Sequence, residues 1–163
     1  MRVMIFLGSE SDFEVIEEAV RTLKDFGVPF ALEVTSAHRS PERTARLVRD
    51  AEAKGAGVFI AVAGKAAHLA GVVAAHTVRP VIGVPVESAA LSGLDALLST
   101  VQMPKGVPVA TMGLGKHGGA NAALLAVEIL ALGDDGLRKK LADHRTKMAA
   151  SVEAASKKIQ EKL

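Results

Sequence analysis

Residues 2–27 read RVMIFLGSESDFEVIEEAVRTLKDFG, and this stretch decides the fold. It opens with six residues that are almost all apolar, as in strands buried on both faces of a sheet. From Phe13 to Phe26 the apolar side chains recur every three or four positions, which predicts an amphipathic helix. Asp12 precedes this helix as an N-cap, and Gly27 follows it as a stop. The stretch therefore predicts a strand, a polar loop and a helix, in that order.

The same order recurs along the first 132 residues. Apolar runs predict strands over residues 2–7, 30–34, 57–62, 80–84 and 107–112, and helical patterns cover residues 13–26, 41–51, 68–76, 93–101 and 120–132. Strands that alternate with helices indicate a parallel sheet with helices on both faces. The predicted fold class is α/β: a three-layer, doubly wound parallel sheet of the flavodoxin-like or Rossmann-like kind, with a long C-terminal helix.

The end of the chain carries a different pattern. Apolar side chains repeat at spacings of three and four from Leu137 to Leu163, which predicts one long amphipathic helix over residues 134–163. This helix is longer than a small sheet needs for cover, so we expect part of it to pack on another subunit. The alternative is that its last turns fray in solvent. We expect a single domain over residues 1–163, with an α/β core over residues 1–132.

Composition excludes several classes of protein. The chain contains no Cys, no Trp, no Tyr and five Phe. The lack of Cys excludes disulfides, thiolate metal sites and cysteine nucleophiles, and the lack of aromatic residues disfavours binding of RNA by base stacking. The apolar N-terminal run turns polar and acidic after Gly8, unlike a signal peptide, and no run reaches the length of a membrane span. We therefore expect a cytoplasmic protein without a membrane partner.

The positive charge of the chain is unevenly distributed. The formal net charge is +2, but residues 137–163 hold eight Lys or Arg against three acidic residues, which leaves the rest of the chain slightly acidic. A solvated helix face explains this better than an arm that binds nucleic acid. We therefore expect no nucleic-acid partner.

Polar residues collect where the expected strands end. They occupy residues 8–12, 36–41, 63–71, 85–88 and 113–119, each directly after one of the five strands. Ligands of open α/β sheets bind outside the carboxyl ends of the strands, near the point where the strand order switches. The convergence of five polar segments on one edge of the sheet therefore predicts a ligand site there.

Three of these segments carry candidate chemistry. Residues 8–12 offer hydroxyl and backbone N–H groups to an anion at a helix start, although Ser and Asp are also ordinary N-caps. Arg39 could bind a phosphate through its guanidinium group. His38 lies beside it, and imidazole is the side chain whose ordinary pKa is closest to neutral pH. His68 lies among small residues that would let a ligand approach, although a core histidine bonded to backbone is the alternative. The neighbourhood of His68 and His76 lacks the further ligands that a metal site needs, so we expect no metal.

Seven motifs occur in order between about residues 2 and 132. They are Gly8-Ser9-x-Ser11-Asp12, Ser36-Ala37-His38-Arg39-x-Pro41, Ala66-Ala67-His68-Leu69, Pro80-Val81-Ile82-Gly83-Val84-Pro85, Gly93-Leu94-Asp95, Gln102-Met103-Pro104-x-Gly106-x-Pro108-Val109 and Asn121-Ala122-Ala123-Leu124-Leu125-Ala126. With these motifs the chain resembles the class I N5-carboxyaminoimidazole ribonucleotide mutases of bacterial purine biosynthesis, within the AIR carboxylase family.

The resemblance implies an isomerase that moves a carboxylate from N5 to ring carbon C4 of an aminoimidazole ribonucleotide, without a cofactor and as a homo-octamer. It implies that His38 is the general acid/base and that His68 lies beside the ring. It also implies a set of residues that hold the ribose phosphate or enclose the carboxylate. This substrate-binding set is Ser9, Ser11, Asp12, Ser36, Arg39, Gly64, Lys65 and Ala66.

The chain departs from the family pattern at a few positions. Lys65 and Ala70 stand where the family usually has Gly and Pro, and Ser40 stands where Thr is common. Lys65 places a cation in the carboxylate loop, as in the related carboxylases that use free carbon dioxide. Direct carboxylation of the aminoimidazole ribonucleotide is therefore an alternative, although Arg39 and His68 favour the mutase. A phosphate- or nucleotide-binding module without catalysis, and a scaffold that recruits partners through its C-terminal helix, are further alternatives.

Overall fold

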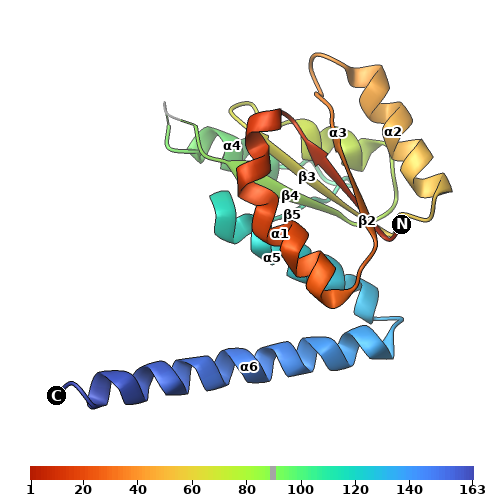
Figure 1. Cartoon of the computed structure of the whole chain (residues 1–163). Helices are drawn as coiled ribbons and strands as arrows, with labels where there is room; N and C mark the ends of the chain where they lie inside the picture. Colours follow the sequence, from red (N-terminus) through yellow and green to blue (C-terminus); the bar gives the residue numbers. More distant parts are fainter. Residues whose placement is uncertain (89–90) are drawn as a thin grey trace.

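The computed structural model describes residues 1–88 and 91–163 (Figure 1). Its centre is a five-stranded parallel sheet in the order β2-β1-β3-β4-β5. The strands are β1 (Val3–Leu7), β2 (Phe30–Val34), β3 (Val58–Gly64), β4 (Val81–Val86) and β5 (Ala110–Thr111). This arrangement confirms the predicted α/β fold class with a doubly wound parallel sheet.

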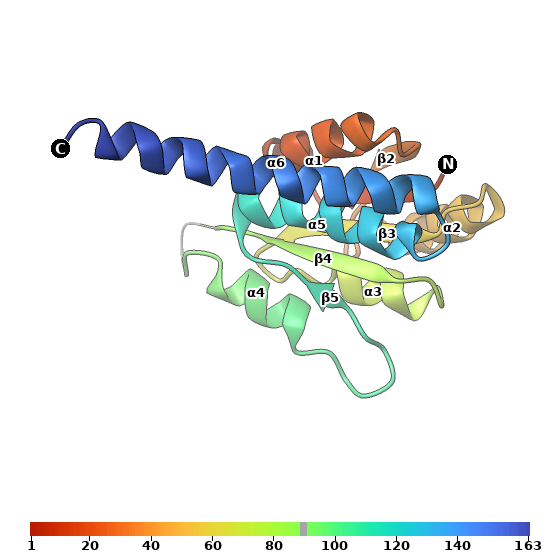
Figure 2. The same cartoon turned by 90° about the horizontal axis from the view of Figure 1, so that it is seen from below.

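Helices cover both faces of the sheet. They are α1 (Phe13–Phe26), α2 (Pro41–Ala53), α3 (Leu69–Ala75), α4 (Leu94–Val101), α5 (Gly115–Ala131) and α6 (Asp135–Gln160). α1 and α5 lie on one face with α6 beyond them, and α2, α3 and α4 lie on the other (Figure 2). The sheet is therefore the middle of three layers.

β1 supplies apolar side chains to two separate cores. Val3, Ile5 and Leu7 pack in the cluster that includes residues of α1 and α5, whereas Met4 and Phe6 pack in the cluster that includes residues of α2 and α3. Successive side chains of a strand point to opposite faces, so a strand enclosed on both sides needs an apolar residue at every position. This explains the continuous apolar run at the start of the chain.

α5 begins earlier than the sequence predicted. Residues 113–119 were expected to be loop and the helix to start at residue 120, but α5 starts at Gly115. Glycine disfavours helix, which is why the pattern there indicated a loop. A Cβ on Gly119 would lie 2.1 Å from the carbonyl oxygen of Val15, so the absence of a side chain lets α5 pack closely against α1. Tertiary packing thus overrides the local preference.

The two last strands also differ from their expected bounds. β5 covers only Ala110–Thr111 instead of residues 107–112, and Pro108, which has no N–H to donate to a sheet, lies just before it. β4 continues to Val86 and contains Pro85, which pairs with Ala63 of β3. The short β5 pairs only with Ile82 and Gly83, so the missing N–H of Pro85 breaks no bond on that side.

α6 is attached to the body only at its base. Its N-cap, Asp134, accepts hydrogen bonds from the Leu137 N–H at 3.1 Å and from Arg2 Nη1 at 2.8 Å. Lys140 Nζ donates to the carbonyl oxygen of Phe26, at the end of α1, at 2.7 Å. All residues from 145 onward are exposed, and the helix extends past the body (Figure 1). The predicted helix is thus confirmed, and its outer half has no cover within the described chain.

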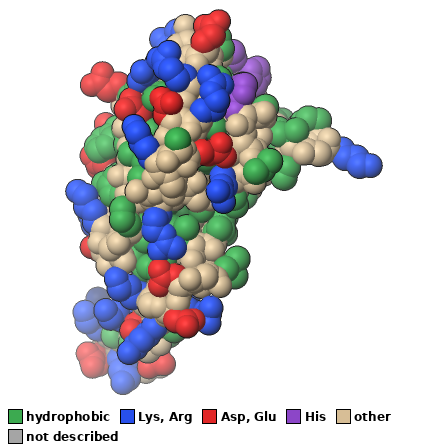
Figure 3. All heavy atoms as spheres, turned by 90° about the vertical axis from the view of Figure 1, so that its right-hand side faces the viewer, with side chains coloured by type: hydrophobic (Ala, Val, Ile, Leu, Met, Phe, Trp, Pro, Cys, Tyr) green, Lys and Arg blue, Asp and Glu red, His purple; other side chains and the backbone are tan. Residues whose placement is uncertain are grey.

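The surface mixes charges of both signs. Figure 3 shows Lys and Arg side chains interspersed with Asp and Glu side chains over one face of the molecule. In the part of the chain that the structure describes, no helix combines the length and the apolar character that crossing a bilayer requires.

Candidate active site

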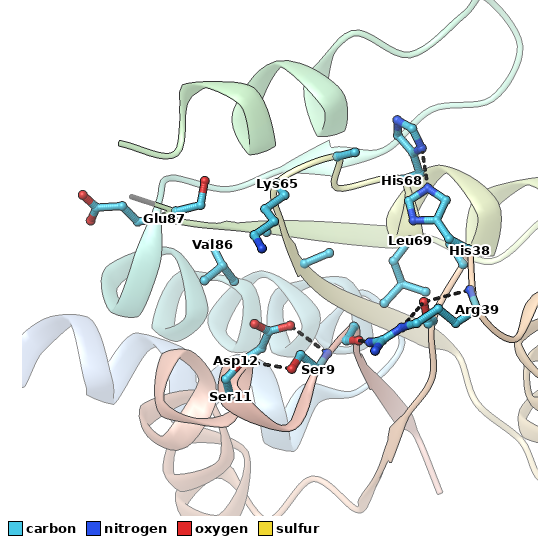
Figure 4. A pocket seen from close by; sticks show the side chains of 17 residues that line it. Ser9, Ser11, Asp12, His38, Arg39, Lys65, His68, Leu69, Val86 and Glu87 are labelled. Carbon is cyan, nitrogen blue, oxygen red and sulfur yellow. Dashed lines mark hydrogen bonds between the residues drawn. The ribbon is translucent and has the colours of Figure 1, made fainter. Parts of the chain in front are cut away.

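The loops that follow β1, β2, β3 and β4 surround an open pocket of about 810 Å³ (Figure 4). Every site residue that the sequence predicted lines this pocket. They are His38, His68, Ser9, Ser11, Asp12, Ser36, Arg39, Gly64, Lys65 and Ala66. The fold brings these residues to one place, while their roles in binding and catalysis are still predictions.

The pocket lies where the chain changes direction across the sheet. From β1 the chain runs outward to β2, and β3 then returns to the other side of β1. α1, which follows β1, and α3, which follows β3, lie on opposite faces of the sheet. The loops that lead to them separate and leave a crevice at the carboxyl ends of the strands, which is where open α/β sheets bind ligands.

The wall next to β1 is a single 3₁₀ turn, η1 (Glu10–Asp12). The Ser9 N–H donates to Asp12 Oδ2 at 3.0 Å, and Ser11 Oγ donates to Ser9 Oγ at 2.9 Å. Asp12 stands at the N-cap position of α1, as expected, but its side chain makes no capping bond to that helix. The carboxylate instead shapes the loop and remains beside the pocket.

Asp12 is buried without a cation beside it. Its exposed fraction is 7%, and no ion pair to it occurs within residues 1–88 and 91–163. Burial raises the pKa of this carboxyl, and the hydrogen bond from the Ser9 N–H acts in the opposite direction. A carboxylate removed from water in this way gains from any hydroxyl or N–H group that a ligand brings.

Arg39 joins the loops after β1 and β2. Its Nη2 donates to the carbonyl oxygen of Gly8 at 3.3 Å, and its Nε lies 3.5 Å from Ser36 Oγ. The backbone N–H of Arg39 also donates to Ser36 Oγ, at 3.1 Å. The guanidinium has five N–H donors in a fork, so donors remain for an anion at the start of α1. Arg39, Ser9 and Ser11 together place a guanidinium and two hydroxyl groups on one wall of the pocket.

His38 and His68 are in direct contact, although thirty residues separate them in the sequence. His38 Nε2 and His68 Nδ1 are 2.8 Å apart, and the ring centroids are 4.9 Å apart in an edge-to-face arrangement. A hydrogen bond between two imidazole nitrogens requires one to donate and the other to accept, so the pair shares one hydrogen at this contact. Both residues are exposed. The alternative, that His68 is a core histidine bonded to backbone, is therefore wrong.

The loop after β3 comes close to β4. A Cβ on Gly64 would lie 3.3 Å from the carbonyl oxygen of Val86, so a larger residue would crowd the neighbouring strand. Lys65 follows with φ 56°, in the left-handed region, and Ala66 and His68 complete the turn through a backbone hydrogen bond of 2.8 Å. The compact loop brings the start of α3, and with it His68, to the edge of the pocket.

The loop after β4 belongs to the segment 85–88, which the sequence placed at this edge of the sheet without assigning a role to any of its residues. Val86, Glu87 and Ser88 line the pocket, and Ser88 Oγ donates to Asp95 Oδ2 at 3.2 Å. Their position directly after the fourth strand is the signal by which the sequence grouped this segment with the three that follow β1, β2 and β3. Residues 113–119, after β5, do not line it. Among the described residues, no three His, Asp or Glu side chains gather as metal ligands.

Comparison with known proteins adds a family to this geometry. Residues 2–151 match the family model described as AIR carboxylase. The chain is 54% identical over 159 residues to the N5-carboxyaminoimidazole ribonucleotide mutase of Methanocaldococcus jannaschii, with 98% of each chain covered. It is 51% identical over 144 residues to the protein of the same name from Escherichia coli K12, with 88% of this chain and 85% of that one covered.

A solved structure resembles the whole chain as well. The crystal structure of Treponema denticola PurE superposes with a TM-score of 0.84 and 29% sequence identity, and the match covers 93% of this chain and 94% of that one. The likeness therefore extends over nearly the whole chain.

Proposed function

Because the chain belongs to the AIR carboxylase family, we propose that it is a mutase that converts N5-carboxyaminoimidazole ribonucleotide to 4-carboxy-5-aminoimidazole ribonucleotide in purine biosynthesis. Relatives that carry the mutase name match nearly its full length. The observation that carries the proposal is the contact of His38 with His68, at 2.8 Å, in a pocket that Arg39 and Asp12 also line. The pocket thus combines a group that moves protons with groups that hold a sugar phosphate.

The wall near β1 binds the ribose phosphate in this proposal. The Arg39 guanidinium and the hydroxyls of Ser9, Ser11 and Ser36 contact the phosphate, and the carboxylate of Asp12 accepts hydrogen bonds from ribose hydroxyls. The start of α1 adds its partial positive charge. These contacts are remote from the reacting atoms, so their binding energy serves to orient the ring against the imidazoles.

The reaction requires one proton to be delivered and one to be removed. When the N5–carboxylate bond breaks, N5 takes a proton and carbon dioxide is released. When C4 attacks the carbon dioxide, the C4 proton leaves and the new carboxylate forms. A histidine can deliver the first proton and remove the second, so the cycle needs no net acid or base. We assign this shuttle to His38, with His68 as the ring that exchanges hydrogen with it.

The released carbon dioxide has to stay beside C4 until it reacts. The loop formed by Gly64, Lys65 and Ala66 encloses the carboxylate in this proposal, because its small residues let backbone approach the ligand closely. Holding carbon dioxide next to the ring makes its recapture an intramolecular step. The residues of the chain suffice for this chemistry, so the proposal includes no metal and no cofactor.

The proposal also covers assembly and location. We expect a single-domain protein that acts in the cytoplasm on a small molecule, without nucleic-acid or membrane partners, and that assembles as a homo-octamer. Met148, Val152 and Ile159 on α6 are 51%, 71% and 58% exposed in the single chain. Contact between subunits would remove these apolar side chains from water, which is favourable.

The experiment that tests the function is a pair of assays with matched variants. The first offers N5-carboxyaminoimidazole ribonucleotide in buffer free of bicarbonate, and the second offers 5-aminoimidazole ribonucleotide with carbon dioxide. We expect faster conversion in the first assay. His38→Asn should lower turnover by about 10²-fold or more, since proton transfer contributes on that scale, while the ribonucleotide still binds.

His76→Asn is the control, because His76 is exposed at the end of α3 and does not line the pocket. Substantial turnover by His38→Asn would contradict the shuttle. Faster conversion in the second assay would instead support a carboxylase that uses free carbon dioxide, which the name of the family model and the cation of Lys65 favour. Binding without conversion in either assay would support a module without catalysis.

A further inference from the structure

The loop after β2, residues 36–40, presents two of the proposed functional side chains in different directions. Figure 4 shows His38 pointing toward His68 and Arg39 pointing away from them. The imidazole contact is 2.8 Å long, and Arg39 Nη2 lies 3.3 Å from the carbonyl oxygen of Gly8. Hydrogen bonds weaken steeply when their distance or angle changes. Both contacts therefore depend on what holds the backbone of this loop in place.

Three hydroxyl groups meet where this loop begins and ends. Thr35, just after β2, is 3% exposed and Thr44 is fully buried, and their Oγ1 atoms are 2.8 Å apart. The third hydroxyl, that of Ser40, lies 3.4 Å from Thr35 Oγ1. None of the three residues lines the pocket. Together they join the end of β2 to the first turn of α2, and the loop lies between.

The hydroxyl groups bond to the backbone at both ends of the loop. Ser40 Oγ accepts from the Ser36 N–H at 3.1 Å and donates to the Ser36 carbonyl oxygen at 3.2 Å. Thr44 Oγ1 donates to the carbonyl oxygen of Ser40 at 3.2 Å, and the nearby Thr35 can then donate to Thr44 Oγ1. In this pattern each of the three hydroxyl hydrogens has an acceptor, as buried polar groups require.

A hydroxyl at position 44 does not follow from packing alone. Val48 and Ala51, which share this face of α2, are apolar and buried. A buried hydroxyl costs free energy unless it is hydrogen-bonded, and threonine is a weaker helix former than alanine. Valine would fill the same space without a polar group. The loop that Thr44 holds, rather than the core, therefore explains its hydroxyl.

We propose that Thr44 is a positioning residue for the pocket. Its buried hydroxyl fixes the loop of residues 36–40, which keeps His38 in contact with His68. The same loop keeps the guanidinium of Arg39 beside the loop after β1. The inference rests on the proposed function, in which His38 moves protons and Arg39 binds the phosphate. A shift of the loop would misplace both groups, and a misplacement of about 1 Å can lower the rate about 10²-fold.

The test separates the hydroxyl of Thr44 from its packing. Thr44→Val keeps the shape of the side chain and loses the hydroxyl, whereas Thr44→Ser keeps the hydroxyl and loses a buried methyl group. Thr100→Val is the matched control, because Thr100 is 2% exposed and its Oγ1 donates to the carbonyl oxygen of Ala96 at 2.8 Å. Thr44 also bonds to the carbonyl four residues before it, but the bond of Thr100 stays within its own helix.

We expect Thr44→Val to lower kcat/KM for N5-carboxyaminoimidazole ribonucleotide about tenfold or more. Its kcat should fall and its KM should rise, since His38 and Arg39 move together. Thr44→Ser should keep turnover close to that of the unmodified protein, yet unfold at a lower urea concentration because a buried methyl group is lost. Thr100→Val should lose stability and keep turnover. Turnover that follows the hydroxyl, while stability follows the packing, is a result that a merely structural role would not give.

A spectroscopic measurement tests the positioning without substrate. The ¹⁵N chemical shifts of imidazole rings report which ring nitrogen carries a hydrogen, and the contact of His38 with His68 requires one nitrogen to donate and the other to accept. In the ligand-free protein, Thr44→Val and Thr35→Val should both lose this arrangement, while Thr44→Ser and Thr100→Val keep it. Thr35→Val removes the partner hydroxyl, and it provides the test if Thr44→Val does not fold.

Three outcomes would overturn the inference. Unchanged turnover in a folded Thr44→Val would show that the loop keeps its position without this hydroxyl. Equal losses of turnover in Thr44→Val, Thr44→Ser and Thr100→Val would assign the effect to stability. Lost turnover with unchanged imidazole spectra would place the effect away from the histidine pair. If the unmodified protein does not convert the ribonucleotide, the proposed function fails, and the spectra still decide whether Thr44 positions His38.

Discussion

Asp12 and Asp134 show two opposite uses of the same side chain. Asp12 lies in the pocket with 7% of its surface exposed, and burial raises its pKa. Asp134 lies at the base of α6, where the hydrogen bond from Arg2 and then that from the Leu137 N–H lower its pKa. The fold therefore favours the charge of Asp134 and opposes the charge of Asp12.

The difference distinguishes a carboxylate that stabilises the fold, Asp134, from one that faces the pocket, Asp12. Arg2, which precedes β1, and the first turn of α6 surround Asp134 with donors, so its carboxylate stabilises the attachment of the helix. Asp12 has one backbone donor and no cation, so its charged form lowers stability until a ligand supplies donors. Groups that lower stability and face a pocket are typical of functional sites.

The largest effect is expected from removal of residues 146–163, the part of α6 beyond its ion pair with α5, which joins Arg145 to Glu128. All of these residues are exposed, so the shortened chain should keep the circular dichroism spectrum of a folded α/β protein. It should lose the assembly of the full chain, because the exposed apolar stripe would be gone. Light scattering coupled to size exclusion measures this.

A variant of full length controls for the deletion. Met148→Ser combined with Val152→Ser keeps the helix and removes part of its apolar stripe, so it should weaken assembly in the same direction. If the shortened chain assembles like the full chain, the outer half of α6 is a solvated extension, and the alternative that its turns fray in solvent is favoured.

Asp12→Asn should have the next largest effect. It should lower the affinity for the ribonucleotide and raise the free energy of unfolding. We expect the affinity for the ribonucleotide to fall about tenfold or more, because a charged acceptor for ribose hydroxyls is lost. The asparagine oxygen can still accept from the Ser9 N–H, so the loop should keep its shape. Titration with the ribonucleotide measures the affinity, and an unchanged value would contradict the assignment.

The stability of the same variant should depend on pH. Because the pKa of Asp12 is raised above 3.8 in the folded chain, the folded state binds more protons than the unfolded state between these two values. The free energy of unfolding of the unmodified protein should therefore fall as the pH rises through this interval. Asp12→Asn has no carboxyl group at this position, so its free energy of unfolding should not fall in this way. In urea unfolding the variant should therefore be more stable than the unmodified protein above the raised pKa of Asp12, and equally stable below pH 3.8. A constant difference at every pH would contradict the argument.

The smallest effect is expected from Asp134→Asn. The pKa of Asp134 is lowered below 3.8 in the folded chain, so its charge contributes stability above that value, which is lost as the pH falls through the lowered pKa. Asparagine still caps the helix but loses the ion pair with Arg2. Urea unfolding at neutral and acidic pH should show a small loss at neutral pH only, with turnover unchanged. Reduced turnover would show that the base of α6 also supports the pocket.

The sequence predicted helices and strands best where the spacing of apolar residues agrees with the residues that start or end an element. α1 covers Phe13–Phe26 and ends at Gly27, with φ 71°, as the pattern indicated. Predictions were weaker where a residue acts through contacts that are distant in sequence. Gly119 reads locally as a helix breaker, and only the approach of α5 to Val15 explains why it lies inside a helix.

The candidate site was predictable as a set of segments but not as a geometry. Each segment follows a strand, and parallel strands end at the same edge of the sheet, which is why His38, Arg39 and His68 could be grouped without coordinates. Their distances depend on the strand order, in which β1 separates β2 from β3. The 2.8 Å contact between the imidazoles and the bond from Arg39 to Gly8 follow from that order and from the turns after each strand.

Local patterns were enough to establish the α/β class, the ends of α1 and the side chains that collect beyond the strands, because spacing along the chain encodes which faces are apolar. Folding in three dimensions decided the rest. It selected the neighbours of each strand, removed Asp12 from water without a cation, and left Lys65 in a backbone conformation that glycine would favour. These features depend on which segments are packed together, and burial, charge environment and strain arise only from that packing.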